Sequence, residues 1–146
     1  MSALGKYLFL VVFISTLIYS CKPDEPIEPE PEDPRDKITG TWTCKETSED
    51  FGATTFTVSL RNHSSDNSKI WIDNIYNLST SESTRSVYAI LSDMSLSIPS
   101  QTVVNDAQII TGNGSISSNY KTINFSYTAN DGSGDLDHIT AIFTKQ

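Results

Sequence analysis

The chain predicts an all-β domain: an antiparallel up-and-down meander of about eight strands closed into a β-barrel, with a β-sandwich as the alternative. From residue 37 to the end, short runs alternate apolar and polar residues, the pattern of strands that bury one face. Clusters of Ser, Asn, Asp and Gly separate these runs, and no stretch keeps a helical period. A closed barrel removes the exposed edges that a sandwich has to cover, so the barrel is favoured.

Each expected strand is recognised by its apolar residues, and each expected turn by its polar ones. The turns fall at 62–68, 79–86, 117–119 and 130–134. Eight or nine strands result. In chain order they are 38–46; the run of Phe56, Val58 and Leu60; that of Ile70 and Ile72; 87–91; the run of Met94, Leu96 and Ile98; 102–104; 107–116; the run of Ile123, Phe125 and Tyr127; and that of Ile139, Ala141 and Phe143.

Two glycines interrupt one of these runs. Gly112 and Gly114 lie within 107–116, and glycine inside a strand marks a bulge or a bend that lets a sheet coil. This feature also favours closure of the sheet.

The first twenty residues have the layout of a secretory signal peptide. Lys6 is followed by eleven uncharged residues from Leu8 to Ile18, too few for an ordinary spanning helix of roughly 20 residues. The segment Ile18-Tyr19-Ser20-Cys21 resembles the bacterial lipobox. Cleavage before Cys21 and lipidation of its thiol are therefore expected, and two or three acyl chains suffice for stable membrane anchoring.

Residues 21–36 are expected to form the lipidated cysteine and a tether. The stretch 22–36 contains five of the six prolines and carries a net charge of −5. Proline and like charges extend a chain, so it should reach up to ~45 Å. The acidic run behind Cys21 is similar to the surface-export signal of Bacteroidetes lipoproteins, which implies an outward-facing place on the outer membrane; a periplasm-facing place is the alternative.

The domain itself, 37–146, carries a net charge of only −4. It has neither a basic footprint for nucleic acid nor a basic patch for docking on a membrane surface. The expected contact with the membrane is thus the lipid at Cys21 alone.

A family resemblance begins at Gly40-Thr41-Trp42. This segment resembles the Gly-x-Trp signature of the lipocalin and calycin superfamily, and the rhythm of 96–101, 111–116 and 141–145 is similar to small lipocalin-like lipoproteins of the Bacteroidetes. The resemblance implies an eight-stranded barrel closed at one end by Trp42 and binding a small apolar ligand. The Thr-Asp-Tyr turn motif of kernel lipocalins is absent, and Lys145 is the nearest substitute for the arginine that stacks on the tryptophan.

The candidate ligand-binding residues are the large side chains expected to point inward. A barrel of eight strands either is filled by its own side chains or holds one small ligand. That these residues are simply core is the favoured interpretation, and ligand binding is what the resemblance implies. They are Trp42, Phe56, Val58, Ile70, Ile72, Phe125 and Tyr127.

Four aromatic residues fall out of phase with these faces: Trp71, Tyr76, Tyr88 and Tyr120. Exposed aromatic rings stack on sugars or anchor a protein partner. They also simply cover the outside of a sheet or the mouth of a barrel.

No catalytic motif is present, and no cofactor or metal is expected. The two histidines, His63 and His138, belong to no recognisable catalytic or metal-binding spacing. Oxygen ligands between Asp131 and Asp137 suggest Ca²⁺, but an EF-hand needs glutamate where Ile142 stands, so a hairpin turn is the better interpretation. Cys44, in phase with Trp42, is expected to be a buried free thiol.

These observations lead to one main hypothesis and two alternatives. The main one is a membrane-anchored lipoprotein with a non-enzymatic lipocalin-like domain that binds a small apolar ligand. The first alternative is an accessory surface lipoprotein with a filled barrel that binds an envelope protein or a glycan. The second is an inhibitor of an extracellular enzyme.

Overall fold

The computed structural model describes residues 31–78, 85–103, 108–130 and 134–146. The segment expected to be a signal peptide, Cys21 and most of the expected tether lie outside these ranges. Residues 32–146 form one compact unit. No helix in the described part of the chain is long and apolar enough to span a bilayer.

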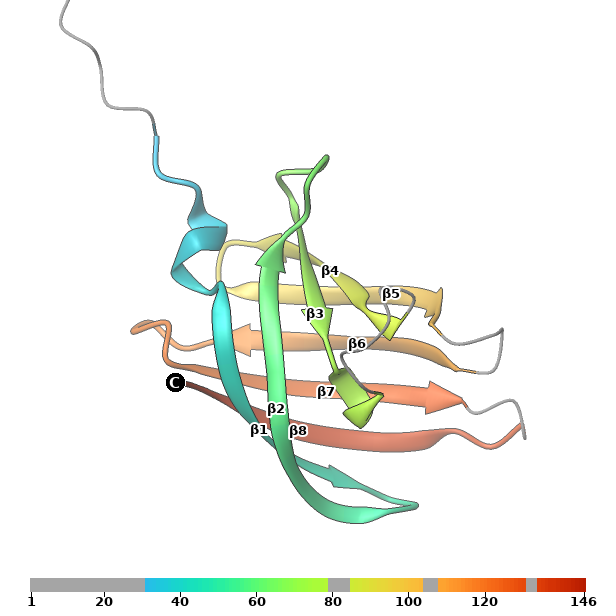
Figure 1. The fold of residues 1–146 in the computed structure, drawn as a ribbon. Helices are drawn as coiled ribbons and strands as arrows, with labels where there is room; N and C mark the ends of the chain where they lie inside the picture. Colours follow the sequence, from blue (N-terminus) through green and yellow to red (C-terminus); the bar gives the residue numbers. More distant parts are fainter. Residues whose placement is uncertain (1–30, 79–84, 104–107, 131–133) are drawn as a thin grey trace, which may run out of the picture. The chain divides into compact units, whose positions relative to one another are not determined.

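Eight antiparallel strands close into an up-and-down barrel in the order in which they occur in the chain (Figure 1). Closure is made by the first and last strands, which pair from Trp42 opposite Lys145 to Ser48 opposite Ile139. The predicted barrel is thus confirmed over the sandwich. The elements are η1 (Pro34–Lys37), β1 (Gly40–Ser48), β2 (Gly52–Asn62), β3 (Lys69–Asp73), η2 (Ile75–Asn77), β4 (Val87–Ser92), β5 (Ser95–Thr102), β6 (Ile109–Ile116), β7 (Thr122–Asn130) and β8 (Asp137–Lys145).

The ninth run expected from the sequence, 102–104, is not a strand of its own. Thr102 is the last residue of β5, Val103 follows it outside any strand, and residue 104 lies outside the described ranges. Of the expected turns, 79–84 and 131–133 also lie outside them.

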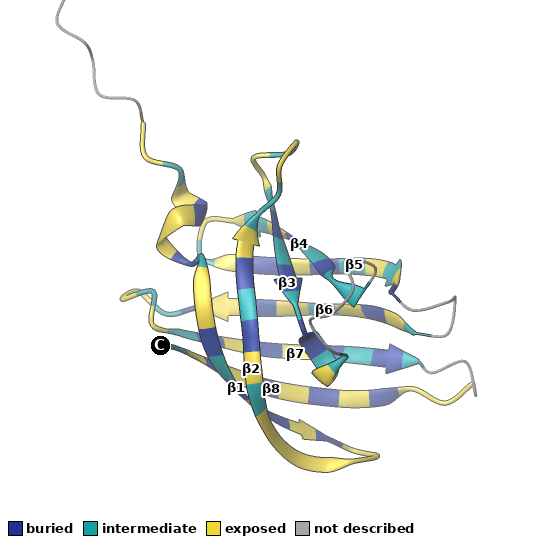
Figure 2. Cartoon of the chain, viewed as in Figure 1, coloured by how far each residue is buried: buried dark blue, intermediate teal, exposed yellow. Residues whose placement is uncertain are grey.

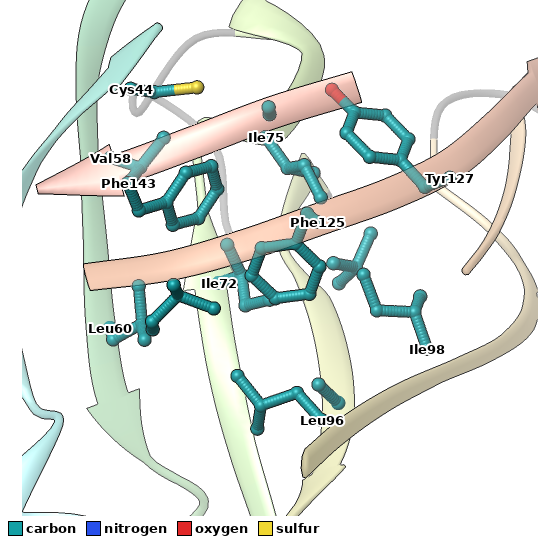
Figure 3. Close-up of a cluster of buried hydrophobic side chains, with 14 of the residues drawn as sticks. Cys44, Val58, Leu60, Ile72, Ile75, Leu96, Ile98, Phe125, Tyr127 and Phe143 are labelled. Carbon is teal, nitrogen blue, oxygen red and sulfur yellow. The ribbon is translucent and has the colours of Figure 1, made fainter. Parts of the chain in front are cut away.

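Buried residues alternate with less buried ones along β7 and β8, as Figure 2 shows. The inward set is almost wholly aliphatic or aromatic, which explains why these runs form strands with one buried face. Phe125 and Phe143 pack with ring centroids 4.9 Å apart in the middle of this core (Figure 3).

Gly112 and Gly114 make room for aromatic side chains of the neighbouring strand. They lie opposite Tyr127 and Phe125 on β7. A Cβ at Gly112 would lie 2.4 Å from Cβ of Tyr127, and one at Gly114 would lie 2.5 Å from the ring of Phe125. The bulge itself is on β5, where the register with β6 shifts between Ile98 and Gln101.

One end of the barrel, called here the closed end, contains the start of β1. The Trp42 indole is fully buried and donates a hydrogen bond of 3.0 Å to the carbonyl of Ile38. The Lys145 ammonium lies 5.7 Å from the centre of the Trp42 ring and donates to the carbonyl of Lys37 at 2.8 Å. Lys145 therefore takes the position over the tryptophan for which the sequence offered it as a substitute.

Arg35, in the segment expected to end the tether, fastens η1 to the closed end. Its side chain is buried, and Nη1 donates to the carbonyls of His63, Asp66 and Lys69 at 2.9–3.1 Å. Its guanidinium also pairs with Asp33, and this hydrogen-bonded contact lowers the pKa of that carboxyl. One arginine thus satisfies three carbonyls of the β2–β3 connection.

Candidate functional site

The seven predicted ligand-binding residues all face the interior, but they do not surround an empty cavity. Trp42, Val58, Ile70 and Ile72 have no exposed area, and a void large enough for water beside them would expose part of their surface. Phe56 is half-buried and packs against the same core. Phe125 and Tyr127 are also buried. That these residues bind a ligand remains a prediction; in this structure they pack on one another.

The opposite end of the barrel, called here the open end, has a different chemistry. It contains the end of β1, the start of β2 and β8, and η2. Here the inward positions of β1 and β8 carry Glu46, Ser48 and Asp137, all three buried. Polar groups at such positions require hydrogen-bond partners, which decide what each group is free to do.

Asp137 is fully engaged by donors of the protein. Ser48 Oγ and Tyr76 OH donate to Oδ2 at 2.6 and 2.7 Å, and the backbone amides of Glu49 and Asp50 donate to Oδ1 at 3.0 and 3.3 Å. Burial alone would raise its pKa, but these hydrogen bonds outweigh burial and lower the pKa. Asp137 therefore stays ionised and holds the β1–β2 turn and η2 on β8.

Ser48 is equally occupied. Its hydroxyl donates to Asp137 and accepts from the backbone amides of Asp50 and Phe51 at 3.1 and 2.9 Å. A hydroxyl that already holds three partners, none of them a histidine, is a structural group and not an activated nucleophile.

Glu46 is the buried carboxyl that retains binding capacity. Tyr127 OH donates to Oε2, and no other hydrogen bond to this side chain comes from the described residues. Burial raises the pKa of Glu46, the hydrogen bond from Tyr127 works against that rise, and the charge of Asp137 adds to it. Burial likewise raises the pKa of Tyr127, so the phenol remains a donor.

A pocket of about 230 Å³ opens beside this carboxyl. It holds roughly seven water molecules at ~30 Å³ each, and so admits a small molecule or one end of a larger one. Aromatic rings form part of its surroundings: Phe51 and Tyr76 meet edge to face at 6.2 Å, and Tyr76 and Tyr127 at 6.4 Å. The lining residues are Glu46, Ser48, Phe51, Thr54, Tyr76 and Asn77.

Figure 3 shows how this polar end joins the core. The ring of Tyr127 lies among the apolar side chains with Ile75 and Phe125, while its phenol oxygen lies at the edge of the cluster. The apolar body of the residue therefore belongs to the core, and its hydroxyl belongs to the open end.

The four out-of-phase aromatics separate into three places. Trp71 and Tyr88 meet edge to face at 6.2 Å on the outside of β3 and β4, whereas Tyr76 lies at the open end. Tyr120 lies at the closed end, with the Lys37 ammonium 5.4 Å from its ring. Trp71 and Tyr88 thus lie on the outer face and Tyr76 lies at the mouth, the two places expected for such rings.

The outer rings are partly covered by other side chains. The His63 ring stacks on Trp71 at 4.9 Å, and the Arg61 guanidinium lies 5.4 Å from the same ring. The Lys69 ammonium lies 4.9 Å from the ring of Tyr88. This outer patch is therefore a packed aromatic and cationic cluster.

The remaining candidates are placed as follows. Cys44 is buried and free, and burial, with the charge of Glu46 second, raises its pKa. Within the described ranges no three His, Cys, Asp or Glu side chains are grouped closely enough to hold a metal ion. Of the suggested Ca²⁺ segment, 131–133 lie outside those ranges, and the Asp137 carboxylate is taken by the hydrogen bonds given above.

The open-end cluster had a signal in the sequence. Glu46 and Ser48 continue the alternation of Trp42 and Cys44, and Asp137 precedes Ile139 in the same phase. A carboxyl at an inward position of a strand indicates a buried polar site. Tyr76 had no such signal, because its approach depends on η2, where its φ is +55°.

Comparison with known proteins places this chain among small closed β-barrels. A redesigned β-barrel, b11L5F_LGL, superposes with a TM-score of 0.50 at 14% identity, covering 77% of this chain and 94% of that one. The barrels EF1p2_mFAP2b and mFAP1, both in structures bound to DFHBI, give the same score and identity and cover 76% and 78% of this chain and 95% and 100% of theirs. At this identity the likeness concerns the fold alone. No protein-family model matches the chain, and no curated protein matches it significantly.

Proposed function

We propose that this protein is a lipid-anchored, outward-facing outer-membrane lipoprotein whose barrel binds, without catalysis, a small ligand with an apolar body. The ligand enters at the open end. The observation that carries this proposal is the pocket of about 230 Å³ that has aromatic side chains in its wall and the buried Glu46 at its side. Pockets that combine apolar walls with a few polar groups are typical small-ligand sites.

Three facts support a ligand at the mouth in preference to one deep inside. The interior around Trp42 is packed. Glu46 has an oxygen without a partner among the described residues, whereas Asp137 and Ser48 are saturated. Two similar barrels carry DFHBI in their solved structures, which makes ligand binding a reasonable use of such a fold.

The proposed family and the proposed lipid anchor are inferred mainly from the sequence. Gly40-Thr41-Trp42 and the position of Lys145 over Trp42 support membership among the small lipocalin-like lipoproteins of the Bacteroidetes. The lipobox-like Ile18-Tyr19-Ser20-Cys21 supports lipidation. A Cys21→Ala precursor should then fail to incorporate radioactive palmitate, and normal incorporation would contradict the anchor.

The ligand proposal is tested by native mass spectrometry of the protein purified from its own cells. We expect an added mass that is lost on mild activation and that is absent from a Tyr76→Ala variant, which removes part of the pocket wall. A protein that carries no added mass, and whose tryptophan fluorescence does not respond to a panel of small aromatic and aliphatic compounds, would overturn it.

A second candidate function, binding of an envelope protein or a glycan, is favoured by the cluster of Trp71 and Tyr88 on the outer face. If this surface works, Trp71→Ala should abolish capture of the partner from envelope extracts, while Phe51→Ala at the pocket should leave capture unchanged.

A further inference from the structure

The charges at the open-end pocket have one sign. The carboxyl groups of Glu46 and Asp137 lie close enough for the second to raise the pKa of the first. Asp50, in the adjoining turn, acts on Tyr76 in the same direction. Among the residues that the structure describes, none of those lining the pocket is basic. A buried carboxyl without a cation beside it is an unfavourable arrangement that a positively charged ligand would relieve.

The aromatic side chains of the pocket suit the same kind of ligand. Phe51 and Tyr76 both line it, and Phe51 is 71% exposed, so its ring is accessible to a ligand. A cation placed over an aromatic face is attracted by the ring quadrupole, and ammonium groups are commonly held between rings and a carboxylate.

We propose that this pocket binds the ammonium group of a small organic cation, with the Glu46 carboxylate as counter-charge and the rings of Phe51 and Tyr76 as its walls. The inference rests on the proposed function and specifies its ligand class. Tyr127 orients the carboxylate by donating to Oε2, which leaves Oε1 for the ligand.

Proton linkage follows from this assignment. A bound cation favours the ionised carboxylate, so binding below the raised pKa of Glu46 releases a proton to solvent, and affinity rises with pH. The other groups around Glu46 with perturbed pKa values are Cys44, Tyr76, Tyr127 and Asp137. The first three have raised pKa values and Asp137 a lowered one, so none of them changes charge between pH 5 and 8.

The experiment compares choline with its neutral isostere 3,3-dimethyl-1-butanol by calorimetric titration of the full-length protein at low salt. The two molecules differ in charge and hardly in shape. We expect choline to bind about ten times more tightly or better, since a contact with a charged group is at stake. We also expect its affinity to be higher at pH 8 than at pH 5.

Variants assign the effect to the pocket. Glu46→Gln should lower the affinity for choline about tenfold or more. Glu49→Gln removes the same charge from an exposed position of the adjoining turn, and it should change the affinity for choline less than about twofold. Phe51→Leu keeps an apolar side chain at an exposed site but removes the ring, and should weaken choline about two- to fivefold. Because Phe51 is outside the core, this variant tests the aromatic wall of the pocket independently of Glu46.

The outcomes separate the two proposals. Equal affinity for choline and the alcohol, lost in Phe51→Leu, would leave a ligand pocket and overturn the cation assignment. Unchanged choline affinity in Glu46→Gln, or no choline binding at all, would also overturn it, while the proposed function is decided by the mass-spectrometric experiment.

Discussion

At the closed end the interior is sealed by an indole whose N–H is satisfied by Ile38 and whose face is covered by Lys145. At the open end the same strand finishes in Glu46 and Ser48. The inward positions of β1 thus change from indole to thiol to carboxyl to hydroxyl within seven residues. One end holds apolar contacts that stabilise the fold. At the other end Ser48 and Asp137 are satisfied by hydrogen bonds within the protein, whereas the buried carboxyl of Glu46 costs stability unless a ligand binds it.

The largest expected effect lies at the closed end. Trp42→Ala should cost about 3–5 kcal/mol of unfolding free energy, because it removes a large buried side chain and leaves a cavity. Urea denaturation measures it. Trp71→Ala is the matched control on the outer face. An equal loss of unfolding free energy in that variant would contradict the special role of Trp42 at the closed end.

The next largest effect is expected for Arg35→Met, which should lower the unfolding free energy by about 2–3 kcal/mol. The reason is that the carbonyls of His63, Asp66 and Lys69 lose a charged donor. Arg61→Met removes an arginine that is half-exposed and paired with Asp73, and should cost about 1 kcal/mol or less. Similar losses for the two variants would mean that η1 contributes little to the closed end.

At the open end, Asp137→Asn should lower the unfolding free energy by about 1–2 kcal/mol at pH 7, because it weakens the hydrogen bonds that the carboxylate accepts. Since the folded pKa of Asp137 is lowered, its contribution is present above the ordinary pKa of about 3.9 and is lost as the pH falls through the lowered value. Urea curves of the variant and the parent should therefore converge as the pH falls through the lowered pKa. Asp135→Asn, at an exposed position two residues earlier, is the matched control and should lower the unfolding free energy by less at pH 7.

The smallest effect has the opposite sign. Glu46→Gln should raise stability by about 1 kcal/mol at pH 8, because a buried carboxylate is replaced by a neutral amide. The raised pKa of Glu46 means that its penalty is absent below the ordinary pKa of about 4.3 and grows as the pH rises toward the folded value. The gain should therefore vanish near pH 4; a gain that persists there would have another cause.

Much of the barrel was predictable because each strand has one face toward a common interior. Alternation located the strands and the inward phase of Trp42, Phe125 and Phe143. It did not show that Gly114 accommodates the Phe125 ring, since pairing between β6 and β7 depends on register.

The site was predictable only in part. The inward phase of Glu46 and Asp137 can be read from the chain, but their meeting requires closure of β1 on β8. The approach of Tyr76 needs left-handed backbone at Asn74 and Tyr76, which no local pattern announces. Likewise, Arg35 looked like a tether residue because its carbonyl partners lie 28 to 34 positions away.

The hydrogen bonds of Arg35 also fix the end of the barrel at which the chain enters the compact unit. The chain enters the compact unit next to the Trp42 seal, and the pocket opens at the far ends of the strands. A force applied through residue 32 therefore acts first on η1 and the start of β1, and not on the residues that line the open-end pocket. If the chain is anchored at Cys21 as proposed, the anchor therefore joins the barrel at its closed end, whatever the length of the segment between them.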